Sequence, residues 1–98
     1  MKKESYFERA IAAYRAWGRG EIMTRKDGEA VERALARMRT GEIDCVKAVY
    51  VAKGSETAKG RGGLAKRYAA DRYYSISQVY YMLKRARFFY AEERGILR

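Results

Sequence analysis

The stretch that decides the fold is LAKRYAADRYYSISQVYYMLKRARFFYAEER, residues 64–94. Apolar side chains recur at helical intervals over 64–69 and again over 79–90, which predicts two helices. Between them, residues 75–78 (SISQ) have the form of a capping box, in which a serine oxygen accepts a backbone N–H and a glutamine side chain reaches back. The stretch therefore predicts a helix-turn-helix, with a short helix and a longer one joined by a tight turn.

The longer helix is expected to have one apolar face and an opposite face of basic, aromatic and amide side chains. The residues that share the apolar face are Val79, Met82, Leu83, Ala86, Phe89 and Tyr90. Gly95 follows them and is the residue type that most easily adopts the left-handed conformation at a helix end. A helix of this kind fits the major groove of DNA, although two packed helices with no further role would show the same spacing.

The residues before this stretch predict three more helices. Periodic apolar residues place them at about 5–17, about 28–39 and 44–53, and Asp27 is expected to cap the second one. We therefore expect an all-α fold, a compact helical domain of about five helices that contains a C-terminal helix-turn-helix.

Residues 54–63, GSETAKGRGG, interrupt the helical pattern with four glycines. Glycine makes a backbone easy to bend and costly to order, so this segment is predicted to be a loop. It lacks the Gly-Lys-Ser/Thr ending of a phosphate-binding loop. Residues 1–98 are thus predicted to form a single domain, with helical support at 5–53, the glycine-rich loop at 54–63 and the helix-turn-helix at 64–94.

Length and composition exclude several classes of protein. The 98 residues have room for one small core, and an apolar fraction of 48% is ordinary for a globular chain. The single cysteine, Cys45, excludes an internal disulfide framework, and the absence of histidine removes the commonest general base and metal ligand. No apolar run approaches the ~20 residues of a membrane span. We therefore expect a soluble intracellular protein that is not an enzyme and has no metal, cofactor or membrane contact.

The charge balance points to a polyanionic partner. Lysine and arginine outnumber aspartate and glutamate by 22 to 12, which gives a formal net charge of +10. The excess is concentrated toward the C-terminus, because residues 53–98 contain 11 basic and 4 acidic side chains whereas residues 1–52 contain 11 and 8. Fourteen of the cations are arginine, whose planar group pairs bidentately with phosphate or guanine. Duplex DNA is the predicted partner.

The candidate base-contacting residues lie in the first turns of the longer helix. They are Ser77, Gln78 and Tyr81, with Tyr80 at the margin of the same face. The Gln78 amide has the donor and acceptor needed to pair bidentately with adenine. The same amide is also the one that would close the capping box, and the sequence leaves both uses open.

The candidate phosphate-contacting residues lie on both predicted helices and the turn between them. They are Lys66, Arg67, Arg72, Lys84, Arg85 and Arg87. Each one alone is explained equally well as a solvated surface charge. Together they form a cluster that only Asp71 opposes, which is typical of a surface that binds phosphates.

Several short elements of this chain occur together in one known family. The early elements are Trp17-Gly18, Asp27 with Ala30, Val31, Ala34 and Leu35, and Tyr50-Val51. The elements of the helix-turn-helix are Ala69, Ser75, Val79, Leu83 and Ala86. On these residues, over about 14–92, the chain resembles the antitermination protein Q family of lambdoid phages, with a helix-turn-helix similar to that of sigma-factor region four. Two features depart from the pattern, because Tyr73 stands where such turns often have glycine and the 54–63 segment is longer than the usual connection.

The resemblance implies a phage-encoded regulator in the cytoplasm of a bacterial host cell. Such a protein binds DNA near a late promoter and engages host RNA polymerase to suppress pausing and termination. Two other functions stay open. One is a helix-turn-helix adaptor for protein contact in a polymerase or phage DNA-packaging complex, and the other is an RNA-binding protein that uses the glycine-rich loop and the tyrosines. Nothing in the sequence sets the oligomeric state.

Overall fold

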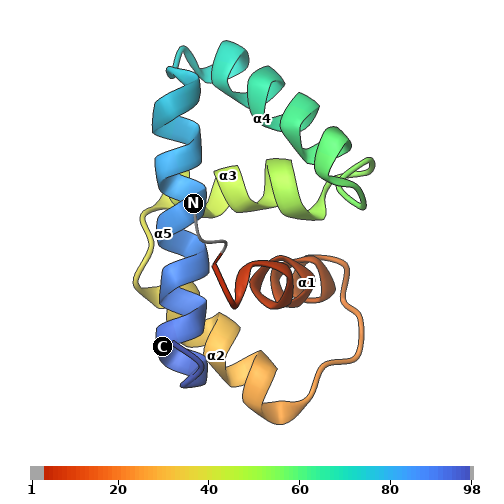
Figure 1. Cartoon of the computed structure of the whole chain (residues 1–98), viewed down its shortest axis with the longest axis vertical. Coiled ribbons are helices and arrows are strands. Elements are labelled where there is room, and N and C mark those ends of the chain that lie inside the picture. The colour runs from red at the N-terminus through yellow and green to blue at the C-terminus, as the bar shows by residue number, and fades with distance from the viewer. Residues whose placement is uncertain (1–3, 98) are drawn as a thin grey trace.

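The computed structural model describes residues 4–97 as a bundle of short helices (Figure 1). The elements are α1 (Phe7–Gly18), α2 (Arg25–Ala36), α3 (Thr40–Val46), the π-helical segment η1 (Lys47–Val51), α4 (Ala58–Arg72) and α5 (Ile76–Arg94). No strand occurs among the described residues. The expected all-α fold with five helices is confirmed. Within the same residues, no helix is long and apolar enough to cross a membrane.

The longest helix, α5, is the element on which the others assemble. It runs the height of the molecule, with α1 and α2 beside its lower half and α3 and α4 beside its upper half (Figure 1). Its buried face includes five of the six residues that the spacing predicts, Val79, Leu83, Ala86, Phe89 and Tyr90, together with Arg87 and Ala91. Met82 is the exception, because it is only partly buried.

Three buried tyrosines fill the centre of the bundle, where α1, η1 and α5 meet. The Tyr14 ring centroid lies 6.4 Å from that of Tyr50 and 6.1 Å from that of Tyr90. Every hydroxyl has a partner, since Tyr14 donates to a backbone carbonyl of α5, Tyr90 donates to the Asp27 carboxylate at 3.0 Å and the Tyr50 oxygen accepts from Arg87 at 2.7 Å. These bonds avoid the cost of burying an unpaired polar group, about 1–3 kcal/mol each.

The connection between α4 and α5 is a three-residue turn, as the sequence predicts. Tyr73 adopts the left-handed conformation, with φ 58° and ψ 33°, which ends α4. The capping box then starts α5, because the Ser75 hydroxyl oxygen accepts from the Gln78 N–H at 3.1 Å and the Gln78 amide oxygen accepts from the Ser75 N–H at 2.8 Å. Gly95, at φ 78°, ends α5 as expected.

The prediction of a loop at 54–63 is wrong for residues 58–63, because α4 begins at Ala58. The Thr57 hydroxyl oxygen caps the helix by accepting from the Gly60 N–H at 3.0 Å. Gly60 lies against the preceding backbone, where an added Cβ would be 1.8 Å from the Gly54 carbonyl oxygen. Glycine at this position therefore lets the first turn of α4 lie directly against the backbone of the preceding turn at Gly54.

The other helix boundaries also differ from those expected. The cap of α2 is Thr24, whose hydroxyl accepts from the Asp27 N–H at 3.2 Å, so this helix begins three residues early. The Asp27 carboxylate accepts instead from Arg94 at 2.7 Å, which joins α2 to the end of α5. The third predicted helix begins at Thr40 and continues into η1, which ends at Val51.

The start of α4 is tested by two glycine-to-alanine variants. Gly63→Ala is expected to raise the free energy of unfolding by about 0.5–1 kcal/mol, because alanine favours a helix and no atom lies within 4 Å of the added methyl group. Gly60→Ala is expected to lower it, because the methyl group would overlap the Gly54 carbonyl. Urea unfolding followed by circular dichroism measures both values. A flexible loop at these positions would give two variants of nearly equal stability.

Candidate nucleic-acid interface

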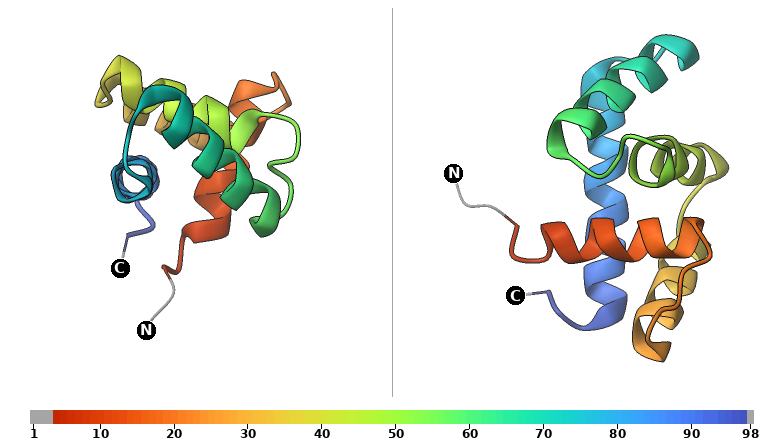
Figure 2. Two further views of the ribbon diagram at one scale, coloured as in Figure 1. Left: turned by 90° about the horizontal axis from the view of Figure 1, so that it is seen from above. Right: turned by 90° about the vertical axis from the view of Figure 1, so that its right-hand side faces the viewer.

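The first three turns of α5 present a face that no other helix covers. Viewed along α5, the other helices gather to one side of it (Figure 2, left). The opposite side carries three exposed residues that are spaced four and three positions apart, Ser77, Tyr81 and Lys84. This outer stripe lies across the helix from the buried Val79 and Leu83.

All four candidate base-contacting residues are exposed in these turns, but they line hollows on two different sides of α5. Ser77, Gln78 and Tyr81 line one hollow on the flank toward α3. Tyr80 lines a different hollow of about 290 Å³, together with Lys84 and residues of α4. The structure therefore brings three of the four together and separates Tyr80 from them.

Gln78 belongs to the cap of α5. Its amide oxygen accepts from the Ser75 N–H, and its own N–H donates to the Ser75 hydroxyl. Bidentate pairing with adenine needs that amide oxygen as well as the amide nitrogen. Between the two uses that the sequence leaves open, the structure thus shows the capping use, and the remaining candidates for base contact are Ser77, Tyr80 and Tyr81.

Three of the candidate phosphate-contacting residues are free at the surface. Lys66, Arg67 and Lys84 are exposed, and within residues 4–97 none of them forms an ion pair. Arg72 is half-exposed, with its guanidinium 5.3 Å from the Tyr68 ring centroid and 3.9 Å from Asp44. These four side chains form the exposed basic surface of α4 and the upper part of α5.

Arg85 is engaged with an acidic partner. Its Nε donates to Glu42 at 2.8 Å, and the Glu42 side chain is 9% exposed. The hydrogen bond to Glu42 is the main cause that raises the pKa of Arg85 above its ordinary value. A phosphate at this position would have to compete with a carboxylate that is already in place.

Arg87 does not lie on the basic surface, and the expectation that it does is wrong. Its Nε and one terminal nitrogen donate to the two Glu4 carboxylate oxygens at 2.8 and 2.9 Å, and its other terminal nitrogen donates to the Tyr50 hydroxyl at 2.7 Å. The residue is 9% exposed. A bidentate pair of this kind fixes both side chains, so Arg87 joins the N-terminal residues to α5 and is not available to phosphate.

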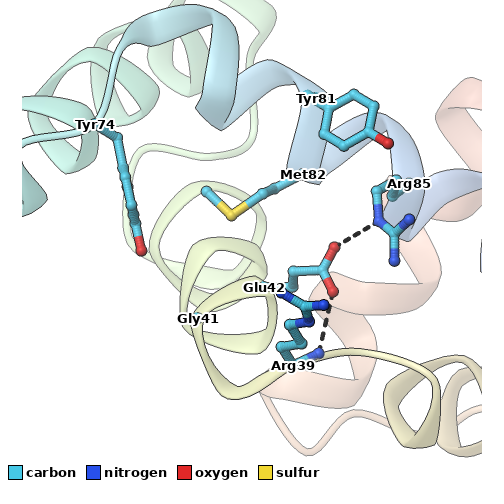
Figure 3. Close-up of a pocket in the computed structure, with 7 residues that line it drawn as sticks. All are labelled: Arg39, Gly41, Glu42, Tyr74, Tyr81, Met82 and Arg85. Atoms are coloured by element: carbon cyan, nitrogen blue, oxygen red, sulfur yellow. Dashed lines mark hydrogen bonds and ion pairs between the residues drawn. The ribbon is translucent and has the colours of Figure 1, made fainter.

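The structure also forms a cleft that the sequence does not indicate. Residues at the start of α3 meet the α4–α5 turn and the first turns of α5 around a space of about 510 Å³ (Figure 3). At its edge, the Glu42 carboxylate accepts from the Arg39 backbone N–H at 3.1 Å. A glutamate three residues after the N-cap of a helix, here Arg39, is a local capping signal, but the approach of α3 to α5 is not visible in the sequence.

The described residues show no candidate metal site. No group of three His, Cys, Asp or Glu side chains within residues 4–97 is arranged to hold an ion. Cys45 is fully buried, and burial raises the pKa of its thiol to about 12. The thiol is therefore protonated at neutral pH and behaves as a small apolar side chain.

Comparison with known proteins adds no assignment, because no family model, curated protein or solved structure matches this chain. The residues that carry the resemblance in the helix-turn-helix nevertheless have clear structural positions. Ala69, Val79, Leu83 and Ala86 are buried between the helices, and Ser75 caps α5.

The position of Arg87 is tested by its contribution to stability. Arg87→Met is expected to lower the free energy of unfolding by about 3 kcal/mol, because it leaves the Glu4 carboxylate without its partner. Adding Glu4→Gln to that variant is expected to restore part of the loss. Lys84→Met is the matched control and is expected to stay within about 0.5 kcal/mol of the wild type. Urea unfolding that gives equal, small effects for Arg87 and Lys84 would place both at the surface.

Proposed function

We propose that this chain is a DNA-binding transcription regulator that places the first three turns of α5 in the major groove of duplex DNA. The observation that carries the proposal is the uncovered outer stripe of Ser77, Tyr81 and Lys84, which follows a capped turn after a helix that bears the exposed cations Lys66 and Arg67. A major groove accepts one α-helix, and helix-turn-helix proteins insert the N-terminal turns of their second helix.

The distribution of paired charges supports this orientation. At the lower end of α5, Arg37 contacts Glu92 at 2.6 Å and Glu93 at 3.0 Å, and Arg94 contacts Asp27 at 2.7 Å. At the upper end, the side chains of Lys66, Arg67 and Lys84 form no ion pair among the described residues. Lys66, Arg67 and Lys84 are therefore available to a polyanion at the upper end.

In this orientation, some of the exposed side chains contact bases and the others contact phosphates. Tyr81 and Ser77 point away from the core in the first turns, where a docked helix meets the groove floor, and Tyr80 reaches the same groove from its edge. Lys84, Lys66 and Arg67 contact phosphates on either side, with Arg72 next to the turn. Arg85 and Arg87 are left out of this set because Glu42 and Glu4 hold them.

The finer proposal is an antitermination factor of the lambdoid phage Q type that binds promoter-proximal DNA and engages RNA polymerase. It is supported by the resemblance and by the buried or capping positions of the residues that carry it. The second candidate is an adaptor for protein contact. It is favoured by the exposed side chains of Ile76 and Tyr80, which lie one turn apart on α5, since adjoining exposed apolar groups are typical of protein interfaces.

Duplex binding is tested by a salt titration with a mixed-sequence 20-bp DNA. The logarithm of the affinity is expected to fall with the logarithm of salt concentration at a slope of several units, at about 0.9 per phosphate contact. Lys84→Ala and Lys66→Ala are each expected to reduce that slope by about 0.9. Lys26→Ala is the control, because this exposed lysine lies on α2 at the other end of the molecule (Figure 1). A flat titration would reject duplex binding and favour the adaptor.

A further inference from the structure

The cleft between α3 and α5 has an aromatic and apolar lining on one side. We call it the tyrosine cleft and define it by Tyr74, Tyr81 and Met82, which line both its main space of about 510 Å³ and an adjoining hollow of about 360 Å³. The Met82 thioether lies between the two tyrosines, and residues 39–42 lie across from them (Figure 3). This size is in the range of small-molecule sites, roughly 300–1,000 Å³.

The two rings offer surfaces for stacking. Tyr74 and Tyr81 are 37% and 62% exposed, so much of each ring is in contact with water. Tyr74 is supported from behind by the buried Tyr68, with ring centroids 6.1 Å apart. Opposite it, Gly41 brings bare backbone toward the cleft, since an added Cβ there would lie 3.6 Å from the Tyr74 hydroxyl. The cleft thus has one aromatic wall supported by the core and one ring, that of Tyr81, that is largely exposed.

The charge that the cleft presents is positive. The Glu42 carboxylate has both oxygens occupied, one by the Arg85 guanidinium and one by the Arg39 backbone N–H. The Arg39 side chain is exposed and, within residues 4–97, forms no ion pair. A ligand with a flat aromatic group and a negative charge matches this combination, and nucleotides have both.

A second observation beside the cleft points the same way. Tyr73, the residue before Tyr74, is 96% exposed although its backbone is left-handed at φ 58°. The left-handed backbone ends α4, but glycine is the usual residue at such a helix end, and the exposed Tyr73 ring makes no contact that explains a bulky side chain there. Strain of this kind is typical of residues whose side chains act on a ligand.

We propose that the tyrosine cleft binds an unpaired nucleobase of single-stranded nucleic acid. The base stacks on Tyr74 with its edge toward Met82 and Tyr81, the adjacent base stacks on Tyr73, and Arg39 contacts the connecting phosphate. Stacking of this kind is tolerant of sequence, because every base has an aromatic face. The site goes beyond the proposed duplex contact and shares only Tyr81 with it, since Tyr73, Tyr74 and Arg39 take no part in the groove and can be changed separately.

The test compares two probes, a single-stranded dT12 and a mixed-sequence 20-bp duplex, by fluorescence anisotropy. Tyr73→Gly and Tyr74→Leu are each expected to weaken dT12 binding about 5- to 140-fold, which corresponds to the loss of one stacked base. Neither variant is expected to change duplex affinity. Arg39→Ala is expected to reduce the salt slope for dT12 by about 0.7, the value for one phosphate contact on a single strand.

Two controls separate binding from folding. Tyr73→Gly is expected to melt at the wild-type temperature or above, because glycine removes the strain of the left-handed residue, so its loss of affinity would not reflect unfolding. Phe88→Leu changes an equally exposed ring outside the cleft and is expected to leave dT12 affinity unchanged.

The outcomes distinguish this proposal from the proposed function. Absence of dT12 binding by the wild type, or wild-type dT12 affinity in both tyrosine variants, would overturn the tyrosine cleft as a base site. Absence of duplex binding with retained, tyrosine-dependent dT12 binding would support it and reject the groove contact instead.

Discussion

The buried face of α5 is the constraint on which the other helices depend. Val79, Leu83, Ala86 and Tyr90 form one continuous side of this helix, and α1, α2, α3 and α4 all pack against it. A 19-residue helix is only marginally stable alone, so its order comes from burying this side. Because one side of α5 holds four helices, its opposite side is left without a partner in its first three turns.

The arrangement of charge follows from the same geometry. Where α5 passes α1 and α2, its charged residues find partners from distant parts of the chain, such as Glu4 for Arg87 and Asp27 for Arg94. Beyond these helices, near α4, no such acidic partners approach Lys66 or Lys84 within the described residues. Part of the excess of cations in a chain with net charge +10 is thus left unpaired near the uncovered turns of α5.

Local signals predicted the C-terminal part of the fold well. The capping box at Ser75 and the glycine at 95 place α5 within about one residue, because both act through backbone bonds to their nearest neighbours. The glycines near 60 misled the prediction, since composition alone cannot separate a flexible glycine from one that admits a close backbone contact. Asp27 was the expected cap of α2, but its carboxylate accepts from Arg94 at the end of α5, and Thr24 caps the helix instead.

Long-range pairing explains the errors at the candidate site. In the sequence, Arg87 is one of several basic residues in α5, like the exposed Lys84. What buries it is the ion pair with Glu4, which lies 83 residues away in the chain. The tyrosine cleft is a further case, because it needs α3 to approach α5 across some 40 residues of chain. By contrast, the exposure of Ser77, Tyr80, Tyr81 and Lys84 follows from helical spacing alone and was predicted.

The central claim is that the uncovered first turns of α5 carry the nucleic-acid contacts. An NMR titration of ¹⁵N-labelled protein with a short mixed-sequence duplex tests it most directly, because each backbone amide reports on its own surroundings. We predict that the largest chemical-shift changes fall on residues 77–84 and on Lys66 and Arg67, with little change on residues 88–94 or α2. The claim would be contradicted if the largest changes fell on residues 88–94 and α2. It would also be contradicted if no amide changed at concentrations that saturate a typical non-specific site.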